Sequence, residues 1–205
     1  MEDVKSSPLE CGVAGRAFPG FSESGDRHVV QRAREGVLVA VVDGLGHGGQ
    51  AAAAALEACA ILESNAGEHV ISLIKRCHVG LKETRGVVAS LAWFNFRDAL
   101  MTWIGVGNIQ GMLLRNDAMM KGGDESLLLR PGVVGNHLPP LQAAVLPVFA
   151  GDSLIFATDG VQPDFDRLEI RNQPPRSAAQ NLLAHYAKGN DDALVLIARY
   201  AGTSV

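Results

Sequence analysis

Short runs of apolar residues, separated by polar and glycine-rich turns, dominate the first part of the chain. Residues 11–18 and 27–33 predict two strands on either side of a turn at residues 21–26, FSESGD. The next run, GVLVAVVD at residues 36–43, is apolar almost throughout. A continuous apolar run bounded by turn signals predicts a strand that is buried on both faces.

Helical periodicity replaces this pattern in three places. Residues 50–64, QAAAAALEACAILES, are apolar nearly all round, which predicts a helix lying between two layers. From about Glu68 to Lys82 the apolar residues recur at helical spacing, which predicts a helix with one buried face. A last helix is predicted from about Ser177 to Lys188.

Further strands are predicted between and after these helices. Their signals lie at residues 86–96, 99–107, 109–115, 125–132, 143–160 and 191–200. The order of strands, paired helices, strands, helix and strand indicates an α+β fold, not a repeating βαβ unit. Because short turns join most strands, we expect two mainly antiparallel β-sheets packed as a β-sandwich and flanked by helices. The length favours a single domain over residues 1–205.

Composition narrows the classes of function. The chain is 47% hydrophobic and 20% charged, as in ordinary folded domains. A net charge of −4 without any basic run argues against a nucleic-acid partner. The apolar runs are shorter than the roughly 20 residues of a membrane span, and the polar start of the chain does not resemble a signal peptide. Three cysteines without a close-spaced pair predict free thiols, so we expect a cytoplasmic protein with no membrane partner.

Carboxylates recur at the ends of the predicted strands. Asp43 and Asp159 each follow an apolar run and precede a glycine, Asp191 and Asp192 open a strand, and Asp26 opens another. Carboxylates gathered at one end of a sheet repel each other unless a cation compensates them. Oxygen ligands without a cluster of His or Cys favour Mg²⁺ or Mn²⁺ over zinc.

A dinucleotide site is the rival interpretation of the same glycine-rich stretch. GLGHGG at residues 44–49 follows a strand, precedes a helix and has the form of the dinucleotide fingerprint, with Glu63 about 20 residues further on. The acid Asp43 precedes the first glycine, however, and the residues before Glu63 continue a helix. The fingerprint also leaves Asp159 and Asp191 unexplained. A nucleotide-binding α/β enzyme therefore stays as the less favoured alternative.

Motif order identifies a known family. VVDGLGHGGQAA, FATDG and NDDALVLIA, with SGD upstream and RGVVAS and IGVGN between them, resemble the metal-dependent serine/threonine phosphatases of type 2C. The similarity is greatest to the small bacterial branch that dephosphorylates regulators of alternative sigma factors, and it extends from about Cys11 to Tyr200. It implies a β-sandwich with a two-metal centre at one end. It also implies a substrate class: phosphoserine or phosphothreonine in bacterial stress-response regulators, such as phosphorylated STAS-domain proteins of the stressosome.

The resemblance assigns roles to single residues. Asp43 would be the central catalytic residue and would bridge two Mn²⁺ or Mg²⁺ ions, and Gly44 would give its backbone carbonyl to one of them. Asp159 and Asp191 would be further metal ligands, and Asp26 would act through water on a metal. In this family a metal-activated water attacks phosphorus in line, and the serine or threonine oxygen leaves.

The chain departs from the family pattern at several positions. Many relatives have an arginine just before the first acidic motif, whereas the nearest upstream arginine here is Arg16. Asn108 stands where larger relatives have an aspartate, so no third-metal carboxylate is predicted. His47, close to Asp43, could protonate the leaving oxygen, although a lone histidine in a glycine-rich loop is more often a polar loop residue. A non-catalytic binding module on the same fold is the second alternative, and the intact set of acids argues against it.

Overall fold

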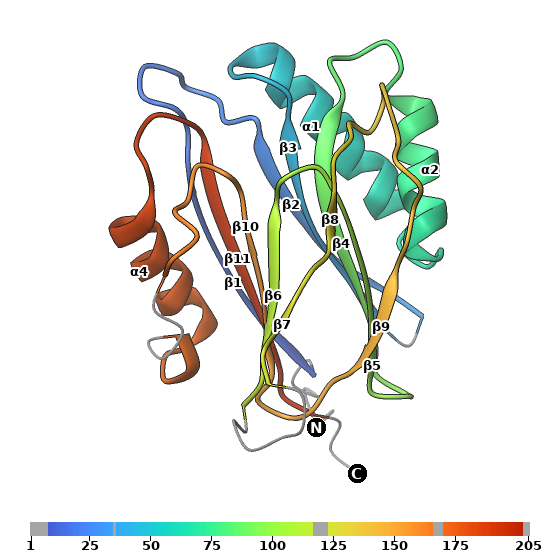
Figure 1. Cartoon of the computed structure of the whole chain (residues 1–205), viewed down its shortest axis with the longest axis vertical. Coiled ribbons are helices and arrows are strands. Elements are labelled where there is room, and N and C mark those ends of the chain that lie inside the picture. The colour runs from blue at the N-terminus through green and yellow to red at the C-terminus, as the bar shows by residue number, and fades with distance from the viewer. Residues whose placement is uncertain (1–7, 35, 117–122, 166–169, 203–205) are drawn as a thin grey trace, which may run out of the picture.

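Two β-sheets lie face to face, with helices on their outer faces (Figure 1). The structure is a computed structural model that describes residues 8–34, 36–116, 123–165 and 170–202. The first sheet has the order β1-β11-β10-β6-β7, and the second has the order β2-β3-β4-β5-β8, with β9 also beside β5. Among the described strands, every pair is antiparallel except β5 with β8. The predicted α+β sandwich is confirmed.

The element bounds follow the predicted pattern closely. The first sheet consists of β1 (Leu9–Arg16), β6 (Gln110–Leu114), β7 (Glu125–Ser126), β10 (Ser153–Ala157) and β11 (Ala193–Tyr200). The second consists of β2 (Asp26–Ala33), β3 (Gly36–Gly44), β4 (Val87–Asn95), β5 (Leu100–Val106), β8 (Leu129–Arg130) and β9 (Ala144–Pro147). The helices are α1 (Gly49–Ser64), α2 (Val70–Gly80) and α4 (Pro175–Tyr186).

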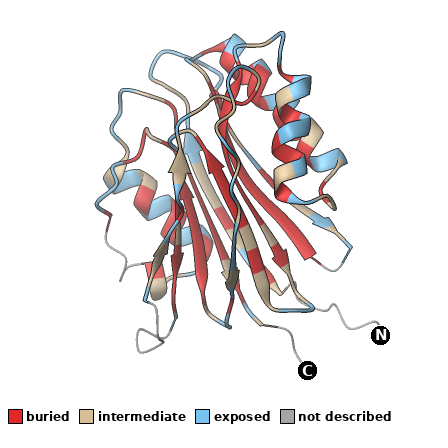
Figure 2. Ribbon diagram, turned by 45° about the vertical axis from the view of Figure 1, so that its right-hand side comes forward, coloured by how far each residue is buried: buried red, intermediate tan, exposed pale blue. Residues whose placement is uncertain are grey.

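The central strand β3 shows why its sequence is apolar throughout. Val39 and Val41 face the core between the two sheets, whereas Ala40 and Val42 face the core under α1 and α2. Successive side chains of a strand point to opposite faces, so a strand with a layer on each side needs apolar residues at every position. Figure 2 shows the buried strands between the partly exposed helices.

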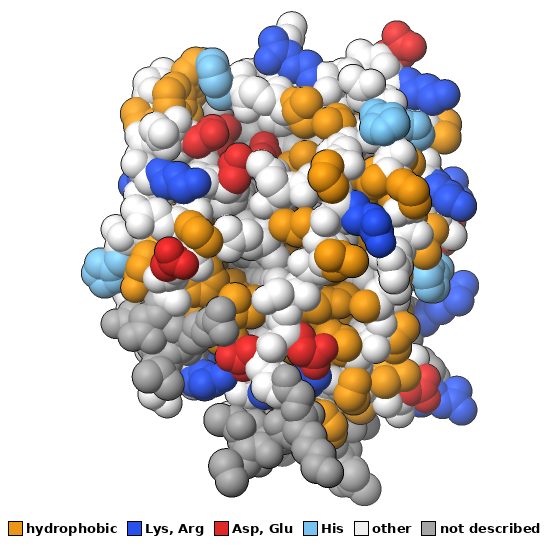
Figure 3. Space-filling view, in the orientation of Figure 1, with side chains coloured by type: hydrophobic (Ala, Val, Ile, Leu, Met, Phe, Trp, Pro, Cys, Tyr) orange, Lys and Arg blue, Asp and Glu red, His pale blue; other side chains and the backbone are white. Residues whose placement is uncertain are grey.

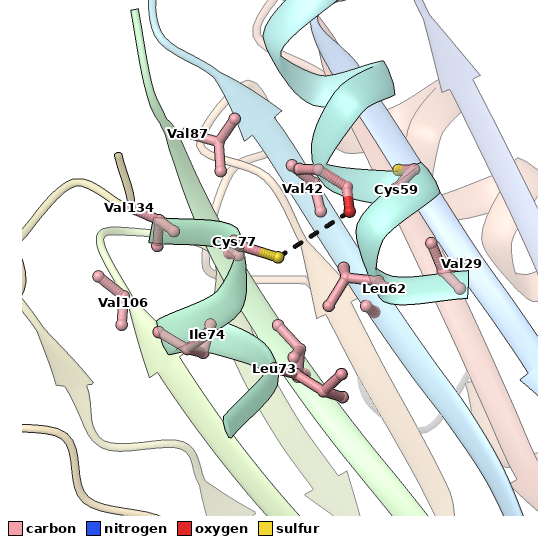
Figure 4. Packing of buried hydrophobic residues seen from close by; sticks show 14 of the residues in the cluster. Val29, Val42, Cys59, Leu62, Leu73, Ile74, Cys77, Val87, Val106 and Val134 are labelled. Atoms are coloured by element: carbon pink, nitrogen blue, oxygen red, sulfur yellow. Dashed lines mark hydrogen bonds between the residues drawn. The ribbon is translucent and has the colours of Figure 1, made fainter. Parts of the chain in front are cut away.

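Helices α1 and α2 pack on the outer face of the second sheet (Figure 1). Their contact is close enough for the Cys77 thiol to donate a hydrogen bond to the carbonyl of Ala58, at 4.0 Å (Figure 4). Burial raises the pKa of both Cys59 and Cys77 to about 12. The two groups therefore stay neutral thiols with little reactivity, as predicted for free cysteines.

The placement of α1 corrects one prediction. One face of this helix is buried, but the opposite face is in solvent, with Leu56 61% exposed. The helix therefore covers a sheet and does not lie between two layers. Its all-round apolar pattern comes largely from alanine, whose small side chain is tolerated at the surface at little cost.

Two predicted strands are each divided between the sheets. The stretch at residues 125–132 forms β7 in the first sheet and β8 in the second, and the stretch at 143–160 forms β9 and then β10. Gly151, at φ +91°, lies in the turn between β9 and β10. Each helix in the described residues is too short or too polar to cross a membrane.

Candidate metal centre

An acidic pocket of about 220 Å³ opens at one end of the sandwich, where β2 and β11 begin and β3 and β10 end. Its walls come from both sheets and from the loops that follow β3 and β5. The lining residues are Asp26, Asp43, Leu45, Gly46, His47, Val88, Asn108, Asp159, Asp191 and Asp192. Figure 3 shows acidic side chains gathered at the upper left of the molecule. The structure thus brings together the four acids that their positions at strand ends predict as a cluster, namely Asp26, Asp43, Asp159 and Asp191. Asp192 lies beside them.

Asp26 and Asp43 face each other directly across β2 and β3. The side chain of Asp26 is 4% exposed and accepts a 2.8 Å hydrogen bond from Oγ1 of Thr158, which follows β10 in the other sheet. Thr158 in turn accepts a 2.9 Å bond from the backbone N–H of Leu194. The hydroxyl therefore fixes one carboxylate of the second sheet to the backbone of the first.

The charges of these acids are poorly compensated within the protein. Burial, and after it repulsion from Asp26 and from the three aspartates of the first sheet, together raise the pKa of Asp43 to about 8. Burial likewise raises the pKa of Asp26 to about 7, although the hydrogen bond from Thr158 opposes the rise. A cation in the pocket would favour the ionised forms of both. The pocket thus has the electrostatics of a cation site.

Asp159 is held by two polar neighbours. Nδ2 of Asn108 donates a 2.8 Å hydrogen bond to Oδ2 of Asp159, and Nζ of Lys188 donates a 2.6 Å bond to its backbone carbonyl. The carboxylate is half-buried and keeps one oxygen free of the bond with Asn108. Asn108, which the sequence marks only as a departure from the family pattern, therefore orients a predicted metal ligand.

The paired acids Asp191 and Asp192 differ in their surroundings. Asp191 is half-buried at the pocket, and its Oδ1 accepts a 2.9 Å bond from the N–H of Asp192. Asp192 is 4% exposed and accepts bonds from the backbone N–H groups of Phe18, at 2.7 Å, and Gly25, at 2.8 Å. It thereby holds the loop between β1 and β2 against the pocket. This structural role was not predicted, because its partners lie more than 160 residues away in the chain.

The two glycines that follow Asp43 and Asp159 are required by close backbone contacts. A β-carbon at Gly44 would lie 2.1 Å from the carbonyl oxygen of Ala51, and one at Gly160 would lie 1.9 Å from that of Asp192. Gly44 is buried next to the pocket and is not one of its lining residues. Close packing therefore explains why a glycine follows each of these two aspartates. The metal-ligand role of the Gly44 carbonyl stays a prediction.

His47 lies on the pocket wall and packs against two aromatic rings. Its ring centroid is 5.3 Å from that of Phe18, with the rings stacked, and 4.8 Å from that of Phe21. Both phenylalanines belong to the loop that Asp192 holds. Arg16, in contrast, lines two neighbouring grooves and is absent from the lining of the acidic pocket. The structure thus brings His47 to the acids and leaves Arg16 outside them.

The donor set restricts the kind of ion that fits. In the described part of the chain, no three Asp, Glu, His or Cys side chains are grouped tightly enough to hold an ion by themselves. A structural zinc site needs four such ligands, whereas Mg²⁺ keeps several waters and is bound through one or two carboxylates. Carboxylates spread around a water-accessible pocket therefore fit hard, hydrated divalent ions.

Comparison with known proteins points to one family. The family model described as stage II sporulation protein E (SpoIIE) matches residues 33–201. The phosphoserine phosphatase RsbX of Bacillus subtilis (strain 168) is 27% identical over 180 residues, which cover 87% of each chain. A solved structure from work on the bacterial stressosome is 32% identical, with a TM-score of 0.86 over 93% of this chain and 99% of that one. A structure of RsbX in complex with magnesium is 24% identical, with a TM-score of 0.82 over 93% of this chain and 94% of that one.

Proposed function

The chain belongs to the SpoIIE family, and from this premise we propose that it dephosphorylates folded bacterial stress-response regulators. It is a metal-dependent protein serine/threonine phosphatase. The observation that carries the proposal is the pocket itself, in which five aspartates from two sheets meet without a cationic side chain among the lining residues. Bound cations would compensate the charge of such a site, and divalent metal ions can activate the water that hydrolyses a phosphate ester.

We assign the metal ligands to the acids of the pocket. Asp43 would bridge two Mg²⁺ or Mn²⁺ ions, with the Gly44 carbonyl on one of them and Asp159 and Asp191 as further ligands, and Asp26 would act through water. When bound, the ions supply an activated water and shield the charge of the phosphate. Support comes from the pairing of Asp43 with Asp26 across the strands and from its repulsion by the aspartates of the first sheet.

The other residues of the site orient these groups. Thr158 holds Asp26, and Asn108 holds one oxygen of Asp159, so that neither carboxylate is free to rotate away from the pocket. We propose that His47 gives a proton to the leaving serine or threonine oxygen. Its imidazole lies on the pocket wall and packs against the rings of Phe18 and Phe21, which restricts its rotation.

The substrate class follows from relatives and from the charge of the chain. RsbX is a phosphoserine phosphatase, and the 32% identical structure comes from a study of the stressosome. We propose phosphorylated STAS-domain regulators as partners, acted on in the cytoplasm by a single catalytic domain. A net charge of −4 gives no support to a nucleic-acid partner.

The decisive experiment measures phosphate release from phosphoserine and phosphothreonine proteins by the full chain. We expect activity that is lost after chelation and is restored by Mn²⁺, and less well by Mg²⁺. Asp43→Asn should abolish turnover, whereas Asp164→Asn, at an exposed aspartate away from the pocket lining, should not change it. Full activity after exhaustive chelation would contradict metal dependence. Binding of the phosphoprotein without turnover would favour the non-catalytic module, and tight NAD(P) binding would favour the nucleotide enzyme.

A further inference from the structure

We propose that Arg85 binds the phosphoryl group of the substrate at the mouth of the acidic pocket. The inference rests on the proposed phosphatase function and identifies a positively charged side chain that would bind the phosphate of the substrate. No arginine could be assigned to this role from the sequence, because Arg16 lies too far from the first acidic motif. The structure puts a different arginine next to the pocket.

Backbone contacts place Arg85 beside the loop that follows β3. Arg85 directly precedes Gly86 and β4, and the carbonyl of Gly86 accepts a 3.1 Å hydrogen bond from the N–H of Leu45. Leu45 and Gly46 both line the acidic pocket. Residue 85 is therefore held next to the pocket rim by a backbone hydrogen bond, and its position does not depend on its own side chain.

The guanidinium group itself reaches the rim. A β-carbon added at Gly46 would lie only 2.8 Å from Nη1 of Arg85, so the guanidinium lies directly beside this glycine. Gly46 has φ +87°, a conformation that side chains rarely adopt, and it leaves the space that Arg85 uses. The charge of Arg85 thus lies at the edge of the pocket that contains Asp43.

The charge of the pocket favours such a group beside the bound ions. Its ionisable lining residues are five aspartates and His47, whereas a phosphate monoester carries a charge of about −1.5 to −2 near neutral pH. A guanidinium group is always charged and can donate two parallel hydrogen bonds to phosphate oxygens. Arg85 is exposed, and in the described residues it makes no ion pair or side-chain hydrogen bond that would compete.

Lys188 and Arg16 also lie near the pocket and are less suited to this role. Lys188 already donates a 2.6 Å bond to the backbone carbonyl of Asp159. Arg16 has its Nη2 atom 3.5 Å from a β-carbon built at Gly189 and lines the grooves beside the pocket. Arg85 alone of these three reaches a residue that lines the acidic pocket without an existing bond of its own.

The test compares Arg85→Gln and Arg85→Lys with the control variant Lys82→Gln. This control removes another exposed positive charge in the same loop. Each variant is assayed with a folded phosphoprotein and with para-nitrophenyl phosphate, and the inhibition constant of inorganic phosphate is measured. Because a hydrogen bond to a charged group is worth about 1.5–3 kcal/mol, we expect Arg85→Gln to raise both KM values and the phosphate inhibition constant roughly 10- to 100-fold. Arg85→Lys should recover part of the loss, and Lys82→Gln should behave as the unchanged protein.

The outcomes separate this inference from the proposed function. Unchanged KM and phosphate inhibition in a folded, active Arg85→Gln variant would overturn the role of Arg85 and leave the phosphatase function intact. A rise in KM for the phosphoprotein alone would also overturn it, because Arg85 would then contact the protein around the phosphate. An unchanged chain that is inactive on both substrates with either metal ion would refute the proposed function itself.

Discussion

Asp43→Asn tests the electrostatics of the pocket through the stability of the metal-free protein. Asparagine keeps the shape of the side chain and removes a charge whose pKa is raised from 3.8 to about 8, first by burial and then by the neighbouring aspartates. Because the raised pKa belongs to the folded state, the folded protein keeps a proton that the unfolded chain has lost. The wild-type protein should therefore lose stability as the pH rises from about 4 to about 8.

The magnitude follows from the size of the shift. One pKa unit corresponds to about 1.4 kcal/mol, so the rise from 3.8 to about 8 sets an upper limit of about 6 kcal/mol above pH 8. Asp43 is half-buried and the pocket opens to water, so we expect about 1–3 kcal/mol of this cost to be relieved in the variant at pH 8. For a chain of this size, that corresponds to roughly 2–10 °C in the midpoint of thermal unfolding.

Urea unfolding in the presence of a chelator, at pH 5 and pH 8, measures this effect. Asp43→Asn should be more stable than the unchanged protein at pH 8 and differ little from it at pH 5, and Asp164→Asn should match the unchanged protein at both. With metal present, the same variant should lose turnover and lose the stabilisation that the ions supply. If Asp43→Asn is no more stable than the unchanged protein at pH 8, Asp43 does not carry the uncompensated charge described above.

Two further predictions concern metal affinity and substrate recognition. Asn108→Ala removes the 2.8 Å bond to Asp159, so the metal concentration for half-maximal activity should rise roughly tenfold. Calorimetry should show a matching loss of metal affinity, and an unchanged affinity would show that Asn108 does not orient a metal ligand. A folded phosphoprotein should have a much higher kcat/KM than a peptide copied from its phosphosite, because contacts around the phosphate supply the binding energy that orients it. Equal values would show that the pocket alone carries recognition.

Much of this protein can be read from its sequence, because local patterns report local burial. The apolar run at residues 36–43 predicts a strand between two layers, and β3 has a core on each face. The Asp-Gly pairs at strand ends predict that acids meet at one end of the sandwich, and Asp43 and Asp159 line one pocket there. In an antiparallel pair the end of one strand lies beside the start of its neighbour. Acids at the end of one strand and at the start of the next therefore meet at the same edge of the sheet.

Only the tertiary structure decides which distant groups touch. The bond from Thr158 to Asp26 spans 132 residues, and the bond from Phe18 to Asp192 spans 174, so spacing along the chain gives no sign of either. The approach of Arg85 to Gly46 likewise depends on how the loop before β4 packs against the loop after β3. The sequence by itself determines which segments are buried and where the acids lie along the strands. The packing of the two sheets decides which carboxylate is held by a hydroxyl, which one holds a loop, and which arginine reaches the pocket, because these contacts join residues that only the closed sandwich brings together.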